Sequence, residues 1–494
     1  MISYKYIHKI RNGDDLLHAY DLMAIMCHRI EILDNEEKKK IYKEYFSTLQ
    51  NYNQDIESTF PFLSKTYGGV EKYNLFSEAQ IHRMLDYIDD CKPVGLLRFL
   101  SYLDGYLDID KNFKIFCDSV KVTRSNVSYF FSLSECTQGY LIPNFKSKWQ
   151  KNPRHTLEEQ MQKPLSILQN YIWIDKQCFC GKVSTEWEVL NVYSDKWNWN
   201  DFDNPFKIVC SPLTATCPYT YSTSFCENTK QNHFYISEYK ETEQIQIKST
   251  VERVLDYANT QKAHIALFPE MMVSKECQFE LQKIVGAKWW YSHPKLICLP
   301  SSVYQDNHKC KNCAKVLDDS GDEIFSYNKQ QEFQLEINNT KFFEDIEPDH
   351  RITIIHVKGI GRIAIIICAD VFNQDIKEIL FKKYEITLML IIAFTNGVDL
   401  FYRSFSCARE SYCDVVWCNT CAAYNVPEEG QTIKQEECIM QYNRPVAAYF
   451  PYGHNSIQEI IAKGCDRSCC KGCGIVISIP SKYNEIGRID LFNF

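Results

Sequence analysis

The stretch that decides the fold is GRIAIIICAD, residues 361–370. Residues 363–367 form an unbroken, mostly β-branched apolar run, which is typical of a strand buried on both faces. A polar thiol, Cys368, stands directly at the end of this run. Because the active sites of α/β folds gather where strands end, and because cysteine reacts as its thiolate, Cys368 is a candidate nucleophile.

Two further polar side chains stand at the ends of strand-like runs. Glu270 follows ALFP at residues 266–269, and Lys329 follows IFSYN at residues 324–328. Each residue taken alone has an ordinary explanation, since a buried cysteine is usually inert and a lysine after a strand is usually solvated. A thiol, a carboxylate and an ammonium at three strand ends nevertheless form a consistent chemical set, and we predict that they converge.

The set suits acyl transfer through a covalent intermediate. Glu270 would accept the proton of the Cys368 thiol and later activate water. Lys329 would stabilise the anionic tetrahedral intermediate, together with the backbone N–H of Ala369. This chemistry needs no cofactor.

In their order along the chain, these segments resemble the motifs of the nitrilase, or carbon–nitrogen hydrolase, superfamily. The matching segments are HIALFPE at 264–270, GDEIFSYNK at 321–329 and GRIAIIICAD at 361–370, with weaker matches at 406–419 and 453–461. The resemblance covers residues 206–494 and implies an α-β-β-α sandwich that dimerises through helices near the cysteine. It also implies a catalytic triad of Glu270, Lys329 and Cys368, and we therefore expect a homo-oligomer.

The sequence departs from the family pattern in the pocket region. Ala369 replaces the aromatic or acidic residue that often follows the nucleophile, and residues 332–350 lack the usual Pro-Gly. Many members carry a second glutamate after the lysine. The candidates in range are Glu332, Glu336, Glu344 and Glu347, of which we favour Glu344 because it precedes Pro348 much as in relatives.

The chain divides into two predicted domains. Residues 1–200 are predicted to be mainly helical, and a polar, aromatic stretch at 194–205 is predicted to be a linker. The predicted helices lie at 14–33, 36–49, 77–103 and 156–172. Residues 206–494 alternate short apolar strands with helices, which predicts an α/β domain.

Composition limits the function classes. The net charge of −8 argues against a dominant nucleic-acid surface. The N-terminus carries no secretory signal, and the longest apolar runs are too short to cross a membrane, so we expect a cytoplasmic protein. In that compartment the 23 cysteines are expected to be reduced rather than paired in disulfides.

Some of the cysteines are spaced like metal ligands. Cys310 and Cys313 form one short-spaced pair, and Cys470 and Cys473 form another, close to further cysteines at 465 and 469. If both pairs lay on loops beside neighbouring strands, they would form a tetrahedral structural zinc site. Free thiols in a cysteine-rich chain are the alternative.

The leading hypothesis is a cysteine-dependent hydrolase of a non-peptide C–N bond, acting on a small-molecule amide or nitrile. Amide hydrolysis is favoured because it dominates the family. The alternative is a nitrilase-like scaffold or signalling subunit, as in some bacterial defence systems. In that case residues 1–200 would bind a protein or nucleic-acid partner.

Overall fold

The computed structural model divides the chain into two compact units, which are described separately. Unit 1 comprises Met1–Phe145, Pro153–Thr185 and Tyr193–Asp195, and unit 2 comprises Lys146–Asn152, Glu186–Val192 and Lys196–Phe494. The residues that the structure describes are 19–47, 52–63, 78–108, 121–124, 127–130, 139–145, 157–175, 187–199, 204–227, 230–288, 291–306, 309–337, 340–426, 444–452, 460–463, 473–480 and 487–493.

Unit 1 is built largely from helices in its described part. These are α2 (Ala19–Glu31), α3 (Asn35–Ser47), α4 (Tyr52–Thr59), η1 (Pro61–Leu63), α5 (Glu78–Asp90), α6 (Pro93–Tyr106), α8 (Leu157–Gln162) and η3 (Pro164–Ile167). The strands β1 (Lys121–Arg124) and β2 (Val127–Phe130) form one antiparallel pair, and β3 (Gly139–Pro143) and β4 (Tyr171–Asp175) form another. Leu22, Met26, Leu97 and Phe99 lie in its fully buried core.

One predicted element of unit 1 is wrong in part. The helix predicted at 156–172 ends at Gln162, and its last residues belong to β4 instead. Pro164 accounts for the end, because proline lacks the backbone N–H that a continuing helix needs. The buried carboxylate of Asp104 then fixes the turn into β4 by accepting the backbone N–H groups of residues 169, 170 and 171.

Unit 2 contains two large sheets. In the first sheet the order is β11-β12-β10-β9-β6-β22-β23, with β13 paired to β12. Its strands are β6 (Phe206–Cys210), β9 (Ile265–Leu267), β10 (Leu296–Cys298), β11 (Ser302–Asp306), β12 (Lys309–Asp318), β13 (Glu323–Asn328), β22 (Cys473–Ile479) and β23 (Arg488–Asn493). The amphipathic helices α9 (Glu241–Thr260) and α10 (Lys275–Ala287) share a buried apolar core with this sheet.

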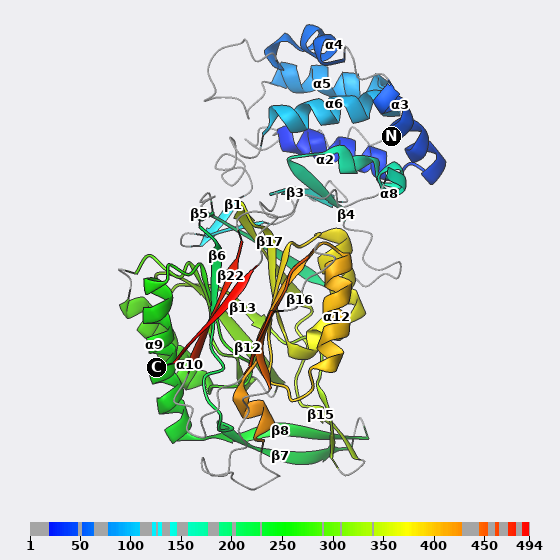
Figure 1. Ribbon diagram of the computed structural model, residues 1–494. Helices are drawn as coiled ribbons and strands as arrows, with labels where there is room; N and C mark the ends of the chain where they lie inside the picture. The colour runs from blue at the N-terminus through cyan, green and yellow to red at the C-terminus, as the bar shows by residue number, and fades with distance from the viewer. Residues whose placement is uncertain are drawn as a thin grey trace. The chain divides into compact units, whose positions relative to one another are not determined.

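The second sheet runs β5-β16-β17-β18-β19-β20-β21 within unit 2. Its strands are β5 (Glu188–Asn198), β16 (Arg351–Lys358), β17 (Gly361–Ile367), β18 (Leu388–Ile392), β19 (Asp414–Cys418), β20 (Pro445–Phe450) and β21 (Ile460–Lys463). The parallel strands β17, β18 and β19 are buried at every residue, as their continuous apolar sequences predict. In Figure 1, α9 and α10 (green) and α12 (Asp399–Glu410, yellow) flank the two sheets on opposite sides. The prediction of a mixed α/β architecture is confirmed.

A third, smaller sheet was not expected from the sequence. It runs β14-β15-β8-β7 and contains β7 (Tyr219–Cys226), β8 (Gln231–Tyr239), β14 (Gln334–Ile337) and β15 (Thr340–Glu344). Strand β15 is parallel to β8, and just after β15 the backbone N–H of Glu347 donates to the carbonyl of Cys310 on β12 of the first sheet. Glu344 is the last residue of β15 and is buried.

The predicted linker at 194–205 is wrong over its first half. Strand β5 continues to Asn198, and the side chain of Trp197 within it is buried. The weaker family match at 453–461 begins outside the described residues. Among the described helices, none combines the length and the apolar character needed to span a bilayer.

Candidate active site

The structure places each of the three predicted residues at the end of a strand. Glu270 lies three residues beyond β9, Lys329 directly follows β13, and Cys368 directly follows β17. All three are buried, with at most 2% of the residue exposed. Cys368 also begins the short 3-10 helix η4 (Cys368–Phe372).

The backbone at two of these strand ends is left-handed. Cys368 has a φ of 44°, and Met271, which follows Glu270, has a φ of 61°. Such conformations cost side-chain-bearing residues about 1–3 kcal/mol, and they persist only where the surrounding structure enforces them. At Cys368 the sharp turn ends the strand and directs the chain away from the sheet.

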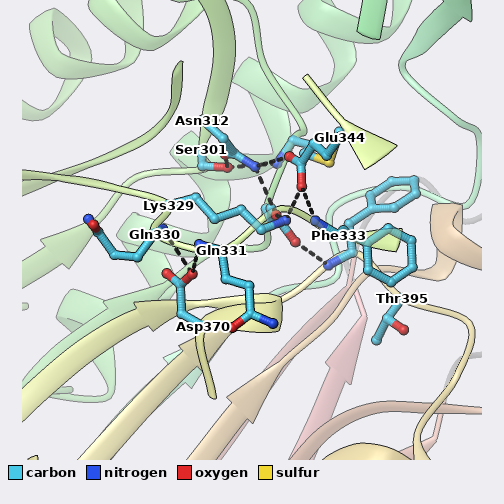
Figure 2. A network of polar contacts seen from close by, with 12 residues as sticks. Ser301, Asn312, Lys329, Gln330, Gln331, Phe333, Glu344, Asp370 and Thr395 are labelled. Carbon is cyan, nitrogen blue, oxygen red and sulfur yellow. Dashed lines mark hydrogen bonds and ion pairs between the residues drawn. The ribbon is translucent and has the colours of Figure 1, made fainter. Parts of the chain in front are cut away.

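The lysine ammonium lies between two carboxylates. Lys329 Nζ is 2.7 Å from Glu270 Oε1 and 2.5 Å from Glu344 Oε2. Figure 2 shows Lys329 extended towards Glu344, with Phe333 beside them. The structure therefore brings the second glutamate favoured from the sequence, Glu344, into the same cluster.

Backbone amides supply a further donor to each carboxylate. Glu270 Oε2 accepts the N–H of Phe394 at 3.0 Å, and Glu344 Oε2 accepts the N–H of Phe333 at 3.2 Å. Donors on both oxygens fix each carboxylate group in one orientation. Hydrogen bonds to an ionised acceptor are each worth about 1.5–3 kcal/mol, so these contacts keep the carboxylates in place.

The Cys368 thiol and the Glu270 carboxylate interact with each other. Each group acts on the pKa of the other. Burial raises the pKa of Cys368 well above its usual range, and the negative charge of Glu270 adds to the rise while Lys329 opposes it. The neutral thiol is therefore the favoured form of Cys368 in the resting cluster.

The charges within the cluster shift the pKa values of Lys329 and Glu270. Burial by itself would lower the pKa of Lys329, but Glu270 and Glu344 outweigh it and hold that pKa well above its usual range. Burial also raises the pKa of Glu270, and the contact with Lys329 opposes this rise. Lys329 is thus an ammonium at neutral pH, and Glu270 is a stronger base than an exposed glutamate.

Asp370 ties the segment of the nucleophile to that of the lysine. Its carboxylate accepts the backbone N–H groups of Gln330 and Gln331 at 2.9 and 2.7 Å (Figure 2). It also accepts the hydroxyl of Tyr327 at 2.8 Å. These donors flank Lys329 on both sides. Burial raises the pKa of Asp370 to about 7. The carboxyl group therefore fixes the ends of β13 and β17 relative to each other.

Comparisons with solved structures find similar proteins at low identity. They include an amidase that is described as a member of the nitrilase superfamily. An amidase from Nesterenkonia sp. is similar at 15% identity over 57% of this chain and 92% of the amidase, with a TM-score of 0.35. In one structure of a mutant of that amidase, an acetamide group is covalently added at the active-site cysteine (14% identity, 56% of this chain and 91% of that one, TM-score 0.37).

A further similar structure is the glutamine-dependent NAD+ synthetase from Acinetobacter baumannii. It matches at 9% identity over 55% of this chain and 45% of the synthetase, with a TM-score of 0.37. No family model and no curated protein matches the chain. Identities and scores this low carry no inference about activity, which has to rest on the geometry of the cluster.

Sequence reasoning missed part of the cluster. Asn312 donates to both carboxylates, and Ser301 in turn contacts Asn312. Asn312 is a polar residue on a strand, which is the available signal. It stands between Cys310 and Cys313, however, and the spacing of these cysteines predicts metal binding instead. The contribution of the Phe394 backbone has no sequence signal, since any residue supplies an N–H.

The predicted zinc site is not formed by the described cysteines. Cys310 and Cys313 lie within β12 rather than on a loop, and their odd spacing points them to opposite faces of the strand. Cys473 begins β22, which β10, β9 and β6 separate from β12. Four strand spacings amount to roughly 19 Å, far beyond the reach of two thiolates on one ion. Cys470 lies outside the described residues, among which no group of three or more metal-ligating side chains occurs.

Proposed function

We propose that this protein is a cysteine-dependent hydrolase that cleaves the C–N bond of a small, non-peptide amide through an acyl-enzyme. One observation carries the proposal. Glu270 contacts both the Lys329 ammonium and the Cys368 thiol, so that base, cation and nucleophile form one buried cluster.

The first half-reaction forms a thioester. Cys368 Sγ attacks the carbonyl carbon of the amide while its proton passes to Glu270, and the carbonyl oxygen becomes an oxyanion. Lys329 and the N–H of Ala369 supply the positive charge that this oxyanion needs. The C–N bond then breaks, and the nitrogen leaves as ammonia or an amine after it has taken the proton back from Glu270.

The second half-reaction consumes water. Glu270, again ionised, removes a proton from a water molecule whose oxygen attacks the thioester carbon. The C–S bond breaks, the proton returns to the sulfur, and a carboxylic acid leaves. Glu270 Oε1 already accepts two donors, from Lys329 and Asn312, whereas Oε2 accepts only the Phe394 N–H among the contacts described. We therefore assign both proton transfers to Oε2.

Glu344 has a supporting role in this scheme. Its contact with Lys329 holds the ammonium together with Glu270. Two carboxylates around one ammonium keep Lys329 charged, so that it acts as an electrostatic stabiliser and not as a base. The remaining acceptor capacity of Glu344 is available to orient the amide nitrogen of a substrate.

The test uses the purified full chain and a panel of small primary amides. Ammonia release and the intact mass of the acyl-enzyme are measured for the wild type, Cys368→Ala and the matched control Cys407→Ala. Cys407 is an exposed thiol on α12. We expect Cys368→Ala to lose both signals and Cys407→Ala to keep both. Ammonia release that survives in Cys368→Ala would overturn the role of Cys368 as nucleophile, whereas a wild type that releases no ammonia would favour the scaffold role.

A further inference from the structure

A single buried amide connects the two carboxylates of the cluster. Asn312, on β12, is 1% exposed. Its Nδ2 donates to Glu270 Oε1 at 2.8 Å and to Glu344 Oε1 at 3.0 Å. Figure 2 shows the Asn312 amide beside Glu344, with the Ser301 hydroxyl on its other side. Both N–H groups of one amide are therefore used on the two acids.

Ser301 fixes the direction in which that amide points. Ser301 Oγ accepts the backbone N–H of Met271 at 2.8 Å, and its own proton is donated to Asn312 Oδ1 at 2.7 Å. Because the oxygen of the amide faces a hydroxyl donor, its nitrogen must face the carboxylates. The reverse orientation would place the amide oxygen against two negative groups.

These contacts close a ring around the base. Met271, which follows Glu270 in a left-handed conformation, donates its N–H to Ser301. The Ser301 hydroxyl orients Asn312, and the Asn312 amide donates back to Glu270. Backbone and side chain of the same residue are thus held by one connected set of hydrogen bonds. Such closed networks restrict rotation more than separate contacts do.

The ring also has an electrostatic consequence. The cluster holds two carboxylates but only one ammonium, and the charge of Glu344 raises the pKa of Glu270. An amide that donates to both ionised groups offsets their repulsion without adding charge. The titratable groups that act on Glu270 are Lys329 on the segment after β13, Glu344 on β15, Cys368 after β17, and the phenols of Tyr219 on β7 and Tyr239 on β8.

We propose that Asn312, oriented by Ser301, is a positioning residue that holds Glu270 as an ionised base facing Cys368. This inference rests on the proposed function, because it assigns Asn312 a task in the same reaction. Asn312 acts through Glu270 and Glu344 and is not itself expected to touch the substrate.

The first test follows the alkylation of Cys368 by iodoacetamide as a function of pH, with the modified site read by peptide mass spectrometry. The variants are Asn312→Leu, which keeps the approximate volume but removes the donors, and Ser301→Ala, which frees the amide to rotate. Gln278→Leu is the matched control. Gln278 is also a fully buried amide, but it donates to the backbone carbonyls of Pro300 and Cys313 and to neither carboxylate.

We expect Asn312→Leu to move the acidic midpoint of alkylation upward by about one pH unit, the equivalent of one lost hydrogen bond to a charged group. It should also slow alkylation at the plateau about tenfold, because the base is less well held. Ser301→Ala should shift the midpoint in the same direction by less, and Gln278→Leu should leave it in place. An unshifted midpoint in Asn312→Leu would overturn the proposal.

A second measurement is independent of cysteine reactivity. If Asn312 serves ionised carboxylates, Asn312→Leu should lower the free energy of unfolding more at pH 8 than at pH 5, whereas Gln278→Leu should lower it equally at both. If wild-type Cys368 resists alkylation, the proposed function is refuted. If the pH difference in unfolding is still observed, the electrostatic role of Asn312 remains supported. Equal losses at the two pH values would refute that role.

Discussion

Removal of the Lys329 ammonium should destabilise unit 2 in a way that depends on pH. Lys329→Met keeps most of the aliphatic volume but leaves Glu270 and Glu344 buried without their cation. Removing one partner of a buried ion pair costs about 3–5 kcal/mol. We expect a loss of this size in the free energy of unfolding at pH 8, where both acids would have to be ionised.

The loss should become smaller as the pH falls. Without the ammonium, Lys329 no longer opposes the effects of burial and of the Glu344 charge on Glu270. The pKa of Glu270 in the folded state therefore rises further above that of the unfolded chain. A group with a raised acid pKa binds more protons in the folded state, so stability increases as the pH falls through that window. At pH 5 the two acids can share protons, and we expect at least half of the loss to be recovered.

The assay is urea unfolding of the full chain at pH 5 and pH 8, followed by tryptophan fluorescence. Trp417 on β19 is fully buried in unit 2 and reports on that unit. The matched variant combines Lys329→Met with Glu270→Gln and Glu344→Gln, which removes the uncompensated charges. It should regain most of the stability at pH 8. A loss that is identical at both pH values, or that persists in the triple variant, would refute the assigned charge balance.

Three further predictions follow from individual contacts. Because the pKa of Glu270 is raised above 4.5, the rate of amide hydrolysis should fall as the pH drops through a midpoint above that value. Glu270→Gln should abolish hydrolysis at every pH, as measured by ammonia release. The pKa of Asp370 is raised from 3.8 to about 7, so its contribution to stability is lost as the pH rises across that interval, and Asp370→Asn should flatten this part of a thermal-unfolding profile. Gly361 has a φ of 107°, and an added Cβ would lie 2.5 Å from two side-chain atoms of Thr387. Gly361→Ala should therefore lower the free energy of unfolding in urea by at least about 1–3 kcal/mol. An unchanged unfolding midpoint would contradict this strain.

The parts of the site that were predictable share a local cause. Cys368, Glu270 and Lys329 each interrupt an apolar, strand-like run, and hydrophobic patterning over a few residues is the signal that sequence carries most directly. The helices α2, α3, α5 and α6 were predictable for the same reason, since each has apolar residues at helical spacing. The favoured second acid, Glu344, depended on resemblance to relatives and not on a local pattern.

The errors arose where local spacing was taken for spatial proximity. Cys310 and Cys313 have the sequence spacing of a zinc pair, yet an extended strand turns them to opposite faces. Cys473 lies in the same sheet as Cys313 but several strands away, a separation that the order of strands sets. The stretch at 194–205 is polar and aromatic and ends in proline, which predicted a linker, yet its first residues continue strand β5.

By itself the sequence determined that unit 2 is an α/β domain with a thiol, a carboxylate and an ammonium at three strand ends. Only the tertiary structure decided that Lys329 lies between two acids, that Asn312 joins them, and that the N–H of Phe394, 124 residues away in sequence, holds Glu270. The physical reason is that these contacts depend on strand order and register across two sheets. Neither property is encoded within any one segment, because each emerges only when the apolar faces of distant segments are buried together.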